Sequence, residues 1–177
     1  MKYVIIGNGI AGVNAAEAIR RMDPDGRIVM IGDETFPPYC RPMISMVLEG
    51  SVPHAKLPIR PAAFYDEWKI EPVLGTRVKG MDVDANRLDV DGRSVFYDRL
   101  LIATGADPRP IKARGLELGN IFYMRTERQV QQMLAALPGA RRALVLGGGL
   151  VGFKAAYGLM RRGLAVTMLI RSGYPLS

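Results

Sequence analysis

Short apolar runs alternate along this chain with segments that favour helix, in an order typical of strand–helix–strand units. Residues 2–6 are apolar and β-branched, which suits a buried strand. Residues 13–21 are rich in alanine, a strong helix former, and residues 27–31 form the next apolar run. The pattern predicts a β–α–β unit at the start of the sequence.

The same pattern returns near the end of the sequence. We expect a strand over 141–146, a helix over 153–162 that ends before Gly163, and another strand over 164–170. This second unit begins about 140 residues after the first. Two such units in one chain indicate two bound nucleotides rather than one.

The intervening sequence consists mostly of short strands and turns, which make a β-rich excursion over residues 70–97. Its strands are expected at four places: 70–74, 76–83, 87–90 and 94–97. A further strand over 99–103 leads into a glycine- and proline-containing turn. An amphipathic helix is predicted over 126–137, with Thr126 as its N-cap.

A glycine-rich turn follows the first strand of each unit. Residues 7–12 read GNGIAG, which fits G-x-G-x-x-G, and residues 147–152 read GGGLVG. The first glycine permits a tight turn, the second lets the backbone approach a pyrophosphate, and the third lets helix and strand pack closely. The free N–H groups at the helix N-terminus then face the phosphates. Since each turn stands between a strand and a helix, the pattern predicts dinucleotide binding rather than a purely structural turn.

The expected cofactor contacts at these turns come from two sets of residues. The first set is Gly7, Gly9, Ile10, Ala11 and Gly12, and the second is Gly147, Gly149, Leu150, Val151 and Gly152. In the first unit an acid also follows the second strand, about 21 residues past the last glycine. A carboxylate there, Asp33 or Glu34, is placed to accept hydrogen bonds from both ribose hydroxyls.

Composition limits the class of protein. The 177 residues are 49% hydrophobic and 23% charged, as in ordinary globular proteins. The single cysteine, Cys40, excludes an internal disulfide, and the single histidine, His54, leaves a Cys/His metal cage without ligands. His54 has no acid nearby in the sequence and is expected at the surface. With no run of about 18 uncharged apolar residues and no basic leader, we expect a cytoplasmic protein outside the membrane.

The net charge of +7 is unevenly distributed. Residues 1–100 hold 13 Lys and Arg against 14 Asp and Glu, whereas residues 101–177 hold 11 against 3. The sequence has no basic helix with interleaved aromatic residues and no known nucleic-acid motif, so a nucleic acid is not the expected partner. A basic rim that attracts an anionic cofactor or an acidic electron-carrier protein explains the surplus, as does a simple solvated surface.

Four motifs in this order resemble the pyridine nucleotide–disulfide oxidoreductase superfamily, in particular its rubredoxin-, ferredoxin- and nitrite-reductase-type flavoproteins. They are GNGIAG at 7–12, PPYCRPMIS at 37–45, LLIATGADPRP at 100–110 and GGGLVG at 147–152. The resemblance implies an α/β fold: a three-layer, Rossmann-like FAD/NAD(P)-binding domain with an inserted β-rich segment and the start of a second dinucleotide-binding unit. It places an FAD-binding domain at 1–110, and a linker with the first part of an NAD(P)-binding domain at 111–177.

The resemblance also implies cofactors and contacts: FAD at the first turn and NADH or NADPH at the second. Arg41 and Pro42 match a position beside the FAD phosphates and flavin, and Val78 matches a backbone contact to the adenine. The segment of Ala103, Thr104 and Gly105 matches one that passes near the flavin nucleotide.

The implied function is electron transfer from a pyridine nucleotide through FAD to an acceptor: rubredoxin, ferredoxin, a nitrite-reducing module, a disulfide or oxygen. Because family members are much longer, the chain is expected to be a fragment of a protein that is a homo-oligomer at full length. The alternative is a non-catalytic nucleotide-binding fragment or assembly subunit.

Two departures from the family concern the flavin. Met46 stands where a lysine near the flavin is usual, and Lys154 stands where a glutamate near the nicotinamide is usual. One hypothesis is that Lys154 supplies, from the opposite wall, the positive charge that stabilises an anionic reduced flavin. The alternative is a lysine that points to solvent.

Two further departures concern the nucleotide and the thiol. Residues 170–172 read Ile-Arg-Ser where NADH-specific members place a carboxylate, and Arg171 is placed to meet a 2′-phosphate, which favours NADPH without excluding NADH. Cys40 lies close to the position of a redox-active cysteine in some relatives, but its spacing differs and it has no partner cysteine. A packed thiol is the favoured interpretation, and redox chemistry beside the flavin is the alternative.

Overall fold

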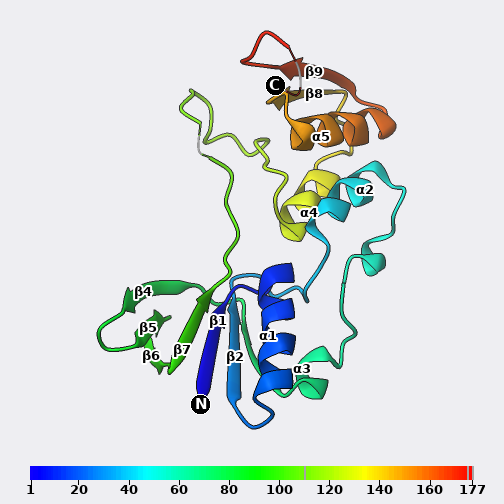
Figure 1. Ribbon diagram of the computed structural model, residues 1–177. Helices are drawn as coiled ribbons and strands as arrows, with labels where there is room; N and C mark the ends of the chain where they lie inside the picture. Colours follow the sequence, from blue (N-terminus) through cyan, green and yellow to red (C-terminus); the bar gives the residue numbers. More distant parts are fainter. Residues whose placement is uncertain (110, 175, 177) are drawn as a thin grey trace. The chain divides into compact units, whose positions relative to one another are not determined.

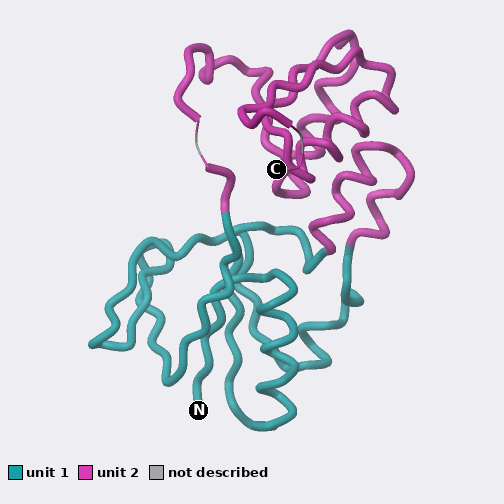
Figure 2. Tube along the Cα trace, turned by 45° about the horizontal axis from the view of Figure 1, so that its top comes forward, with its two compact units in different colours: residues 1–39, 58–106 teal, residues 40–57, 107–177 magenta. Residues whose placement is uncertain are grey.

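The computed structural model describes residues 1–109, 111–174 and 176, and the chain divides into two compact units. Unit 1 combines residues 1–39 with 58–106, and unit 2 combines residues 40–57 with 107–177, as Figure 2 shows. Residues 40–57 therefore pack with the second unit although they lie early in the sequence. The expected cofactor domains, 1–110 and 111–177, stay a prediction, and Pro110 at their boundary lies outside the described residues.

Unit 1 is built on a four-stranded parallel sheet in the order β3-β2-β1-β7 (Figure 1). Its strands are β1 (Lys2–Ile6), β2 (Arg27–Gly32), β3 (Ile70–Leu74) and β7 (Arg99–Ile102). Parallel neighbours need a crossover, which helix α1 (Ile10–Met22) provides between β1 and β2. The central strands are buried on both faces, which explains why their sequences are continuous apolar runs rather than alternating ones.

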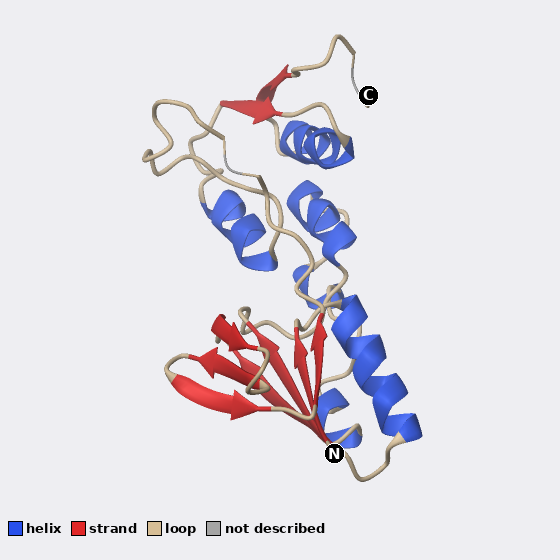
Figure 3. Ribbon diagram, turned by 60° about the vertical axis from the view of Figure 1, so that its left-hand side comes forward, coloured by secondary structure: helices blue, strands red, loops and turns tan. Residues whose placement is uncertain are grey.

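Two apolar clusters cover the two faces of this sheet. On one face, Ile5, Ile28 and Met30 pack with Val13 of α1 and Phe64 of the short helix α3 (Phe64–Glu67). On the other face, Val4, Val29 and Ile31 pack with Leu88 and Val90 of a small antiparallel sheet and with Tyr97, which follows that sheet in the sequence. Unit 1 thus has three layers, helices, parallel sheet and small sheet, as Figure 3 shows. The predicted Rossmann-like α/β class is confirmed.

The small sheet is a meander of β4 (Val78–Asp82), β5 (Arg87–Val90) and β6 (Arg93–Phe96). Its β5–β6 turn has positive φ at both Asp91 and Gly92, the backbone of a tight hairpin turn. The β-rich excursion is confirmed, with two differences. The segment 70–74 belongs to the parallel sheet as β3, and the strand expected over 76–83 starts only at Val78, where the register of its pairing shifts.

Unit 2 contains a two-stranded parallel sheet of β8 (Arg142–Leu146) and β9 (Ala165–Leu169), joined by helix α5 (Leu150–Arg161). It also contains α4 (Glu127–Ala135), α2 (Ile44–Glu49) and the one-turn helices η1 (Arg41–Met43) and η2 (His54–Lys56). Thr126 caps α4 as predicted, because its side chain accepts the Gln129 N–H in a capping box. Among the described residues, no helix combines the length and apolar character needed to span a membrane.

Helix α2 packs against both α4 and α5. Gly158 of α5 makes the close approach possible, because a Cβ atom there would lie 3.2 Å from Leu48 Cγ. Arg162 then donates two hydrogen bonds to the C-terminal end of α2, to the Leu48 carbonyl at 2.7 Å and the Val47 carbonyl at 3.1 Å. These contacts, over 114 residues of sequence, hold residues 40–57 in unit 2.

Candidate dinucleotide sites

The first glycine turn joins β1 to α1, and its first and last glycines are required by the protein's own packing. Gly7 has φ +126°, and a Cβ atom there would lie 2.1 Å from the Ala103 carbonyl oxygen. Its N–H donates to the Ile31 carbonyl at 2.7 Å, which joins the turn to β2. A Cβ atom on Gly12 would lie 2.0 Å from the Gly7 carbonyl oxygen, so this glycine lets α1 approach the turn.

Gly9 differs from both, because a Cβ atom on it would meet nothing within 4 Å. Its φ of −96° suits any residue, so internal packing and backbone strain do not require a glycine there. The first turn of α1 contains no acidic residue, and no side chain of the described residues caps it. Ile10, the first residue of the helix, is 59% exposed. The first N–H groups of an α-helix have no partner within the helix, so this open helix N-terminus fits a pyrophosphate that approaches from outside.

Asn8, which the glycine pattern leaves unspecified, braces this turn. Its Oδ1 accepts a hydrogen bond from the Tyr65 hydroxyl at 2.9 Å, and its Nδ2 donates to the Phe36 carbonyl at 3.5 Å. Burial raises the pKa of Tyr65 above its ordinary value. Sequence reasoning missed this brace, because Asn8 and Tyr65 are 57 residues apart.

The ends of the neighbouring strands bring other predicted residues to the first turn. Ala103 donates its N–H to the Ile6 carbonyl at 2.8 Å, so the segment with Thr104 and Gly105 begins beside Gly7. At the end of β2, Asp33 is exposed, whereas the Glu34 carboxylate accepts a hydrogen bond from the Tyr39 hydroxyl at 2.8 Å. Val78, the first residue of β4, packs against the apolar cluster under the sheet.

The predicted residues of the segment 37–45 belong to unit 2. The Arg41 guanidinium donates to the Arg125 carbonyl at 3.2 Å, and the Pro42 carbonyl accepts the Ser45 hydroxyl at 3.0 Å. Cys40 is a half-buried free thiol. Because Arg41 and Pro42 lie in unit 2 and the first turn lies in unit 1, their meeting at one cofactor stays a prediction.

The second glycine turn, between β8 and α5, has the same backbone geometry. Gly147 has φ +116°, and its N–H donates to the Leu169 carbonyl at 2.9 Å. A Cβ atom on Gly152 would lie 2.2 Å from the Gly147 carbonyl oxygen, and one on Gly149 would meet nothing within 4 Å. Leu150, at the first helical position, is 64% exposed. The second turn therefore repeats the open approach to the helix N-terminus seen at the first.

A cavity of about 310 Å³ opens at this second turn. Its lining is Gly147, Gly148, Gly149, Ile170, Arg171 and Ser172. The predicted Arg171 is thus brought to the turn, while Val151 is exposed on α5 and Lys154 is half-buried. The predicted helix starts three residues too late, because Gly149 rather than a polar side chain forms its N-cap.

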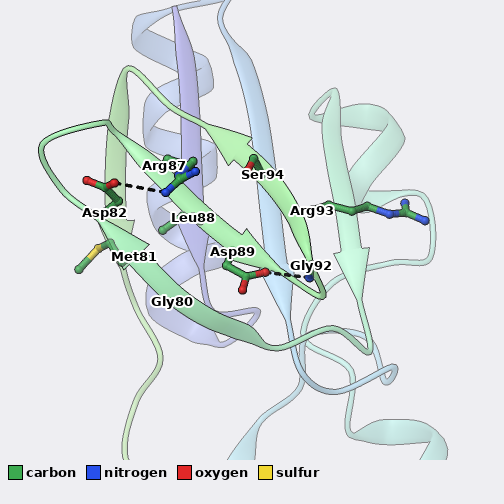
Figure 4. Close-up of a pocket in the computed structure, with 9 residues that line it drawn as sticks. All are labelled: Gly80, Met81, Asp82, Arg87, Leu88, Asp89, Gly92, Arg93 and Ser94. Atoms are coloured by element: carbon green, nitrogen blue, oxygen red, sulfur yellow. Dashed lines mark hydrogen bonds and ion pairs between the residues drawn. The ribbon is translucent and has the colours of Figure 1, made fainter.

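Two features fall outside the predicted sites. His54 Nε2 lies 2.6 Å from Glu127 Oε1, 73 residues away in the sequence, so the expectation that His54 lacks an acid partner is wrong. Its side chain is 42% exposed, as expected of a residue at the surface. A second cavity, of about 340 Å³, lies on the meander (Figure 4). It is lined by Gly80, Met81, Asp82, Arg87, Leu88, Asp89, Gly92, Arg93 and Ser94. None of these residues was predicted at a site.

Two β–α–β units, each with a glycine turn open to a phosphate, define a protein of the Rossmann-like dinucleotide-binding class. The chain belongs to the pyridine nucleotide-disulphide oxidoreductase family, which it matches over residues 1–177. The resemblance drawn from the four motifs is confirmed.

Curated relatives and solved structures agree with this family. Rhodocoxin reductase of Rhodococcus erythropolis is 33% identical over 179 residues, which cover 100% of this chain and 42% of that protein. The ferredoxin reductase component of a Cupriavidus chlorobenzene dioxygenase is 38% identical over 167 residues, or 93% of this chain and 40% of that protein. A ferredoxin reductase structure from Rhodopseudomonas palustris matches at TM-score 0.91 and 28% identity, over 99% of this chain and 44% of that one.

The covalent putidaredoxin reductase–putidaredoxin complex also matches, with TM-score 0.85 and 31% identity, over 94% of this chain and 41% of that one. The chain thus spans about two-fifths of the length of these proteins.

Proposed function

We propose that the protein is a flavin-dependent NAD(P)H oxidoreductase, which passes electrons from a pyridine nucleotide through FAD to an acceptor. The observation that carries the proposal is the repetition of one geometry in both units. Gly9 and Gly149 occupy equivalent places in the two turns. A Cβ atom at either position would meet nothing within 4 Å, so packing within the protein does not require glycine there. One open turn suits a protein that binds one nucleotide, whereas two suit a hydride donor and a redox cofactor. The relatives named as reductases support the same function.

In the first site, backbone N–H groups of Ile10, Ala11 and Gly12 hold the FAD pyrophosphate, with Asp33 or Glu34 at the ribose. The segment from Ala103 to Gly105 would line the path toward the flavin, and Val78 would contact the adenine. For Arg41 and Pro42 of unit 2 we propose contacts to the FAD phosphates and flavin. When bound, FAD supplies the redox chemistry, and the residues of the chain supply orientation and electrostatics.

In the second site, N–H groups of Leu150, Val151 and Gly152 hold the pyrophosphate of the pyridine nucleotide, and Gly147 and Gly149 keep its approach open. Lys154, two residues further along α5, is the charged group we propose to stabilise an anionic reduced flavin. Lys154 is half-buried and has no hydrogen bond or ion pair within the described part of the chain. For Cys40 we propose a packing role, since the chain offers no second cysteine.

For the acceptor we propose a small acidic electron-carrier protein. Named relatives act as reductases of ferredoxin or rubredoxin. Residues 101–177 carry 11 basic against 3 acidic residues, which gives this part of the chain a charge that attracts an acidic partner. Rates of reduction of a ferredoxin and of a rubredoxin, measured over a range of ionic strength, test this. A rate that does not fall with added salt contradicts the electrostatic attraction.

The proposed function itself is tested by the visible absorption spectrum of the purified full-length protein, recorded anaerobically before and after NADH and NADPH. Flavin bands that bleach with either nucleotide are the expected result. Bands that persist with both favour a non-catalytic nucleotide-binding protein or assembly subunit, the alternative suggested by Met46 and Lys154 in place of the usual pair. A colourless protein contradicts FAD binding. The same preparation, in analytical ultracentrifugation, tests the proposed homo-oligomer, and cell fractionation tests the proposed cytoplasmic location.

A further inference from the structure

The end of β9 lies at the same edge of unit 2 as the second glycine turn. Leu146 and Leu169 are register partners, and the Gly147 N–H donates to the Leu169 carbonyl at 2.9 Å. Residues 170–172 and the glycines therefore form two walls of one cavity. In a dinucleotide-binding β–α–β unit, the residues after the second strand lie beside the ribose of the adenosine half. The side chains at 170–172 thus decide which adenosine fits.

The second β–α–β unit, residues 142–169, and the residues after it carry no carboxylate that could bind a ribose diol. Residues 128–177 contain no Asp or Glu at all, and they contain seven Arg and Lys residues. In the first unit, by contrast, Asp33 and Glu34 follow β2 at the equivalent place. The two sites share a backbone geometry and carry opposite charge where the ribose lies.

The side chains at the end of β9 are an apolar one, a cation and a small hydroxyl. Ile170 packs against Gly148, where a Cβ atom would lie 2.6 Å from Ile170 Cγ2. The Ser172 hydroxyl already donates to the Tyr174 carbonyl at 2.9 Å, which fixes the turn that follows. Arg171 is exposed, lines the cavity, and has no hydrogen bond or ion pair to any described residue. Its guanidinium is the one charged group in the lining of this cavity.

We propose that this site selects NADPH over NADH, with the Arg171 guanidinium binding the 2′-phosphate of the adenosine. The inference rests on the proposed second nucleotide site and sets the protein apart from relatives that are named for NAD(+). A guanidinium matches a phosphate dianion in charge and in its fork of donors, whereas it offers no acceptor to a ribose hydroxyl. The apolar Ile170 side chain offers no hydrogen-bond partner to the 2′-hydroxyl of NADH.

The test uses the adenosine halves of the two nucleotides, so that binding is measured without turnover. Isothermal titration calorimetry with the full-length protein compares 2′,5′-ADP with 5′-ADP for wild type, Arg171→Ala and Arg142→Ala. Arg142 is the matched control, because it is exposed at the opposite end of the same two-stranded sheet. Wild type is expected to bind 2′,5′-ADP at least about tenfold more tightly, and Arg171→Ala to lose about tenfold for 2′,5′-ADP only. Arg142→Ala is expected to change neither affinity.

Each of the following outcomes contradicts one part of the proposal. Equal or tighter binding of 5′-ADP by wild type overturns the selection of NADPH and leaves the proposed function standing. This comparison uses only the wild-type protein, so it does not depend on the folding of any variant. Equal loss of both ligands in Arg171→Ala overturns the role of Arg171 in reading the 2′-phosphate. If wild type binds neither ligand, the second nucleotide site itself is wrong, and the proposed function fails with it.

Discussion

The two glycine turns of this protein have the same backbone and different surroundings. Gly7 and Gly147 both have strongly positive φ, and Gly12 and Gly152 both let a helix approach within reach of a carbonyl oxygen. At the first turn, the end of β7 lies against Gly7, whereas a Cβ atom on Gly147 would meet nothing within 4 Å. Asn8 braces the first turn, while Gly148 stands in its place at the second. The comparison of the two turns separates what the backbone requires, the glycines at the first and last positions, from what differs between the sites, the side chains around the turn.

The largest difference is expected between Gly7→Ala and Gly147→Ala. Both substitutions place a Cβ atom on a backbone with φ above +110°, which costs about 2 kcal/mol. Gly7→Ala also drives that atom against the Ala103 carbonyl oxygen and is expected to cost about 2 kcal/mol more. Urea denaturation of the full-length variants measures the free energy of unfolding. Equal losses for the two variants contradict the crowding by β7.

The next comparison separates packing from ligand approach within one turn. Gly12→Ala places a Cβ atom 2.0 Å from the Gly7 carbonyl oxygen and is expected to cost about 2–3 kcal/mol of unfolding free energy. Gly9→Ala is expected to change it by less than about 0.5 kcal/mol, because the added atom lies in open space. The same Gly9→Ala protein is expected to lose flavin on purification, measured by absorbance per mole of protein. Full flavin content in it contradicts the phosphate approach at Gly9.

Tyr65→Phe removes a side-chain hydrogen bond to Asn8, whose place at the second turn is taken by Gly148, a residue without a side chain. The Tyr65 hydroxyl donates to Asn8 Oδ1 at 2.9 Å, so its loss is expected to cost about 1 kcal/mol of unfolding free energy. FAD affinity is expected to fall several-fold, because the turn is then less well held. Tyr157→Phe is the control, since this exposed tyrosine of α5 belongs to unit 2 and makes no hydrogen bond to Asn8 among the described residues. An unchanged flavin affinity in Tyr65→Phe would show that the brace supports only the fold.

The smallest expected effect is at Lys154, which takes the place in α5 that Asn14 has in α1. Asn14 donates its amide to the Ile10 carbonyl of its own helix at 2.7 Å, whereas Lys154 has no such partner among the described residues. Loss of a positive charge worth about 1 kcal/mol to an anionic reduced flavin lowers a two-electron potential by about 20 mV. Spectroelectrochemistry of Lys154→Met measures this, with Arg161→Met as control. A potential equal to that of wild type rejects the hypothesis.

Local patterns were enough to predict both β–α–β units. The strands β1, β2, β8 and β9 lie within a residue or so of their expected ends, because a buried parallel strand followed by a glycine turn leaves an uninterrupted apolar run. The pairing of β3 with β2 could not be read in the same way. Its residues look like the excursion strands that follow, and only the parallel register of Ile28 with Ile70 assigns them to the main sheet.

The candidate site residues differ in the same way: some follow from local sequence, and others depend on contacts between distant parts of the chain. Glycines and the charge pattern after each second strand are local, so the sequence alone was enough to propose Gly9, Gly149 and Arg171 as candidate site residues; their contacts to a nucleotide stay a prediction. The brace of Asn8 by Tyr65 and the pairing of His54 with Glu127 join residues far apart in the chain. The packing of residues 40–57 on α5 also depends on residues far apart in the chain, since Gly158 and Arg162 contact Leu48.

The placement of α2 in unit 2 has a consequence for the order in which the protein is made. The strands of unit 1 are complete once Ile102 has been synthesised, whereas α2 must wait for α5, which ends at Arg161. At about 5–20 residues per second, the ribosome takes roughly 5–20 s to add the hundred or so residues that separate the end of α2, at Glu49, from the end of α5. During that time Ile44, Val47 and Leu48, all buried in the finished protein, have no α5 to cover them. This nascent stretch is where a chaperone has most to protect.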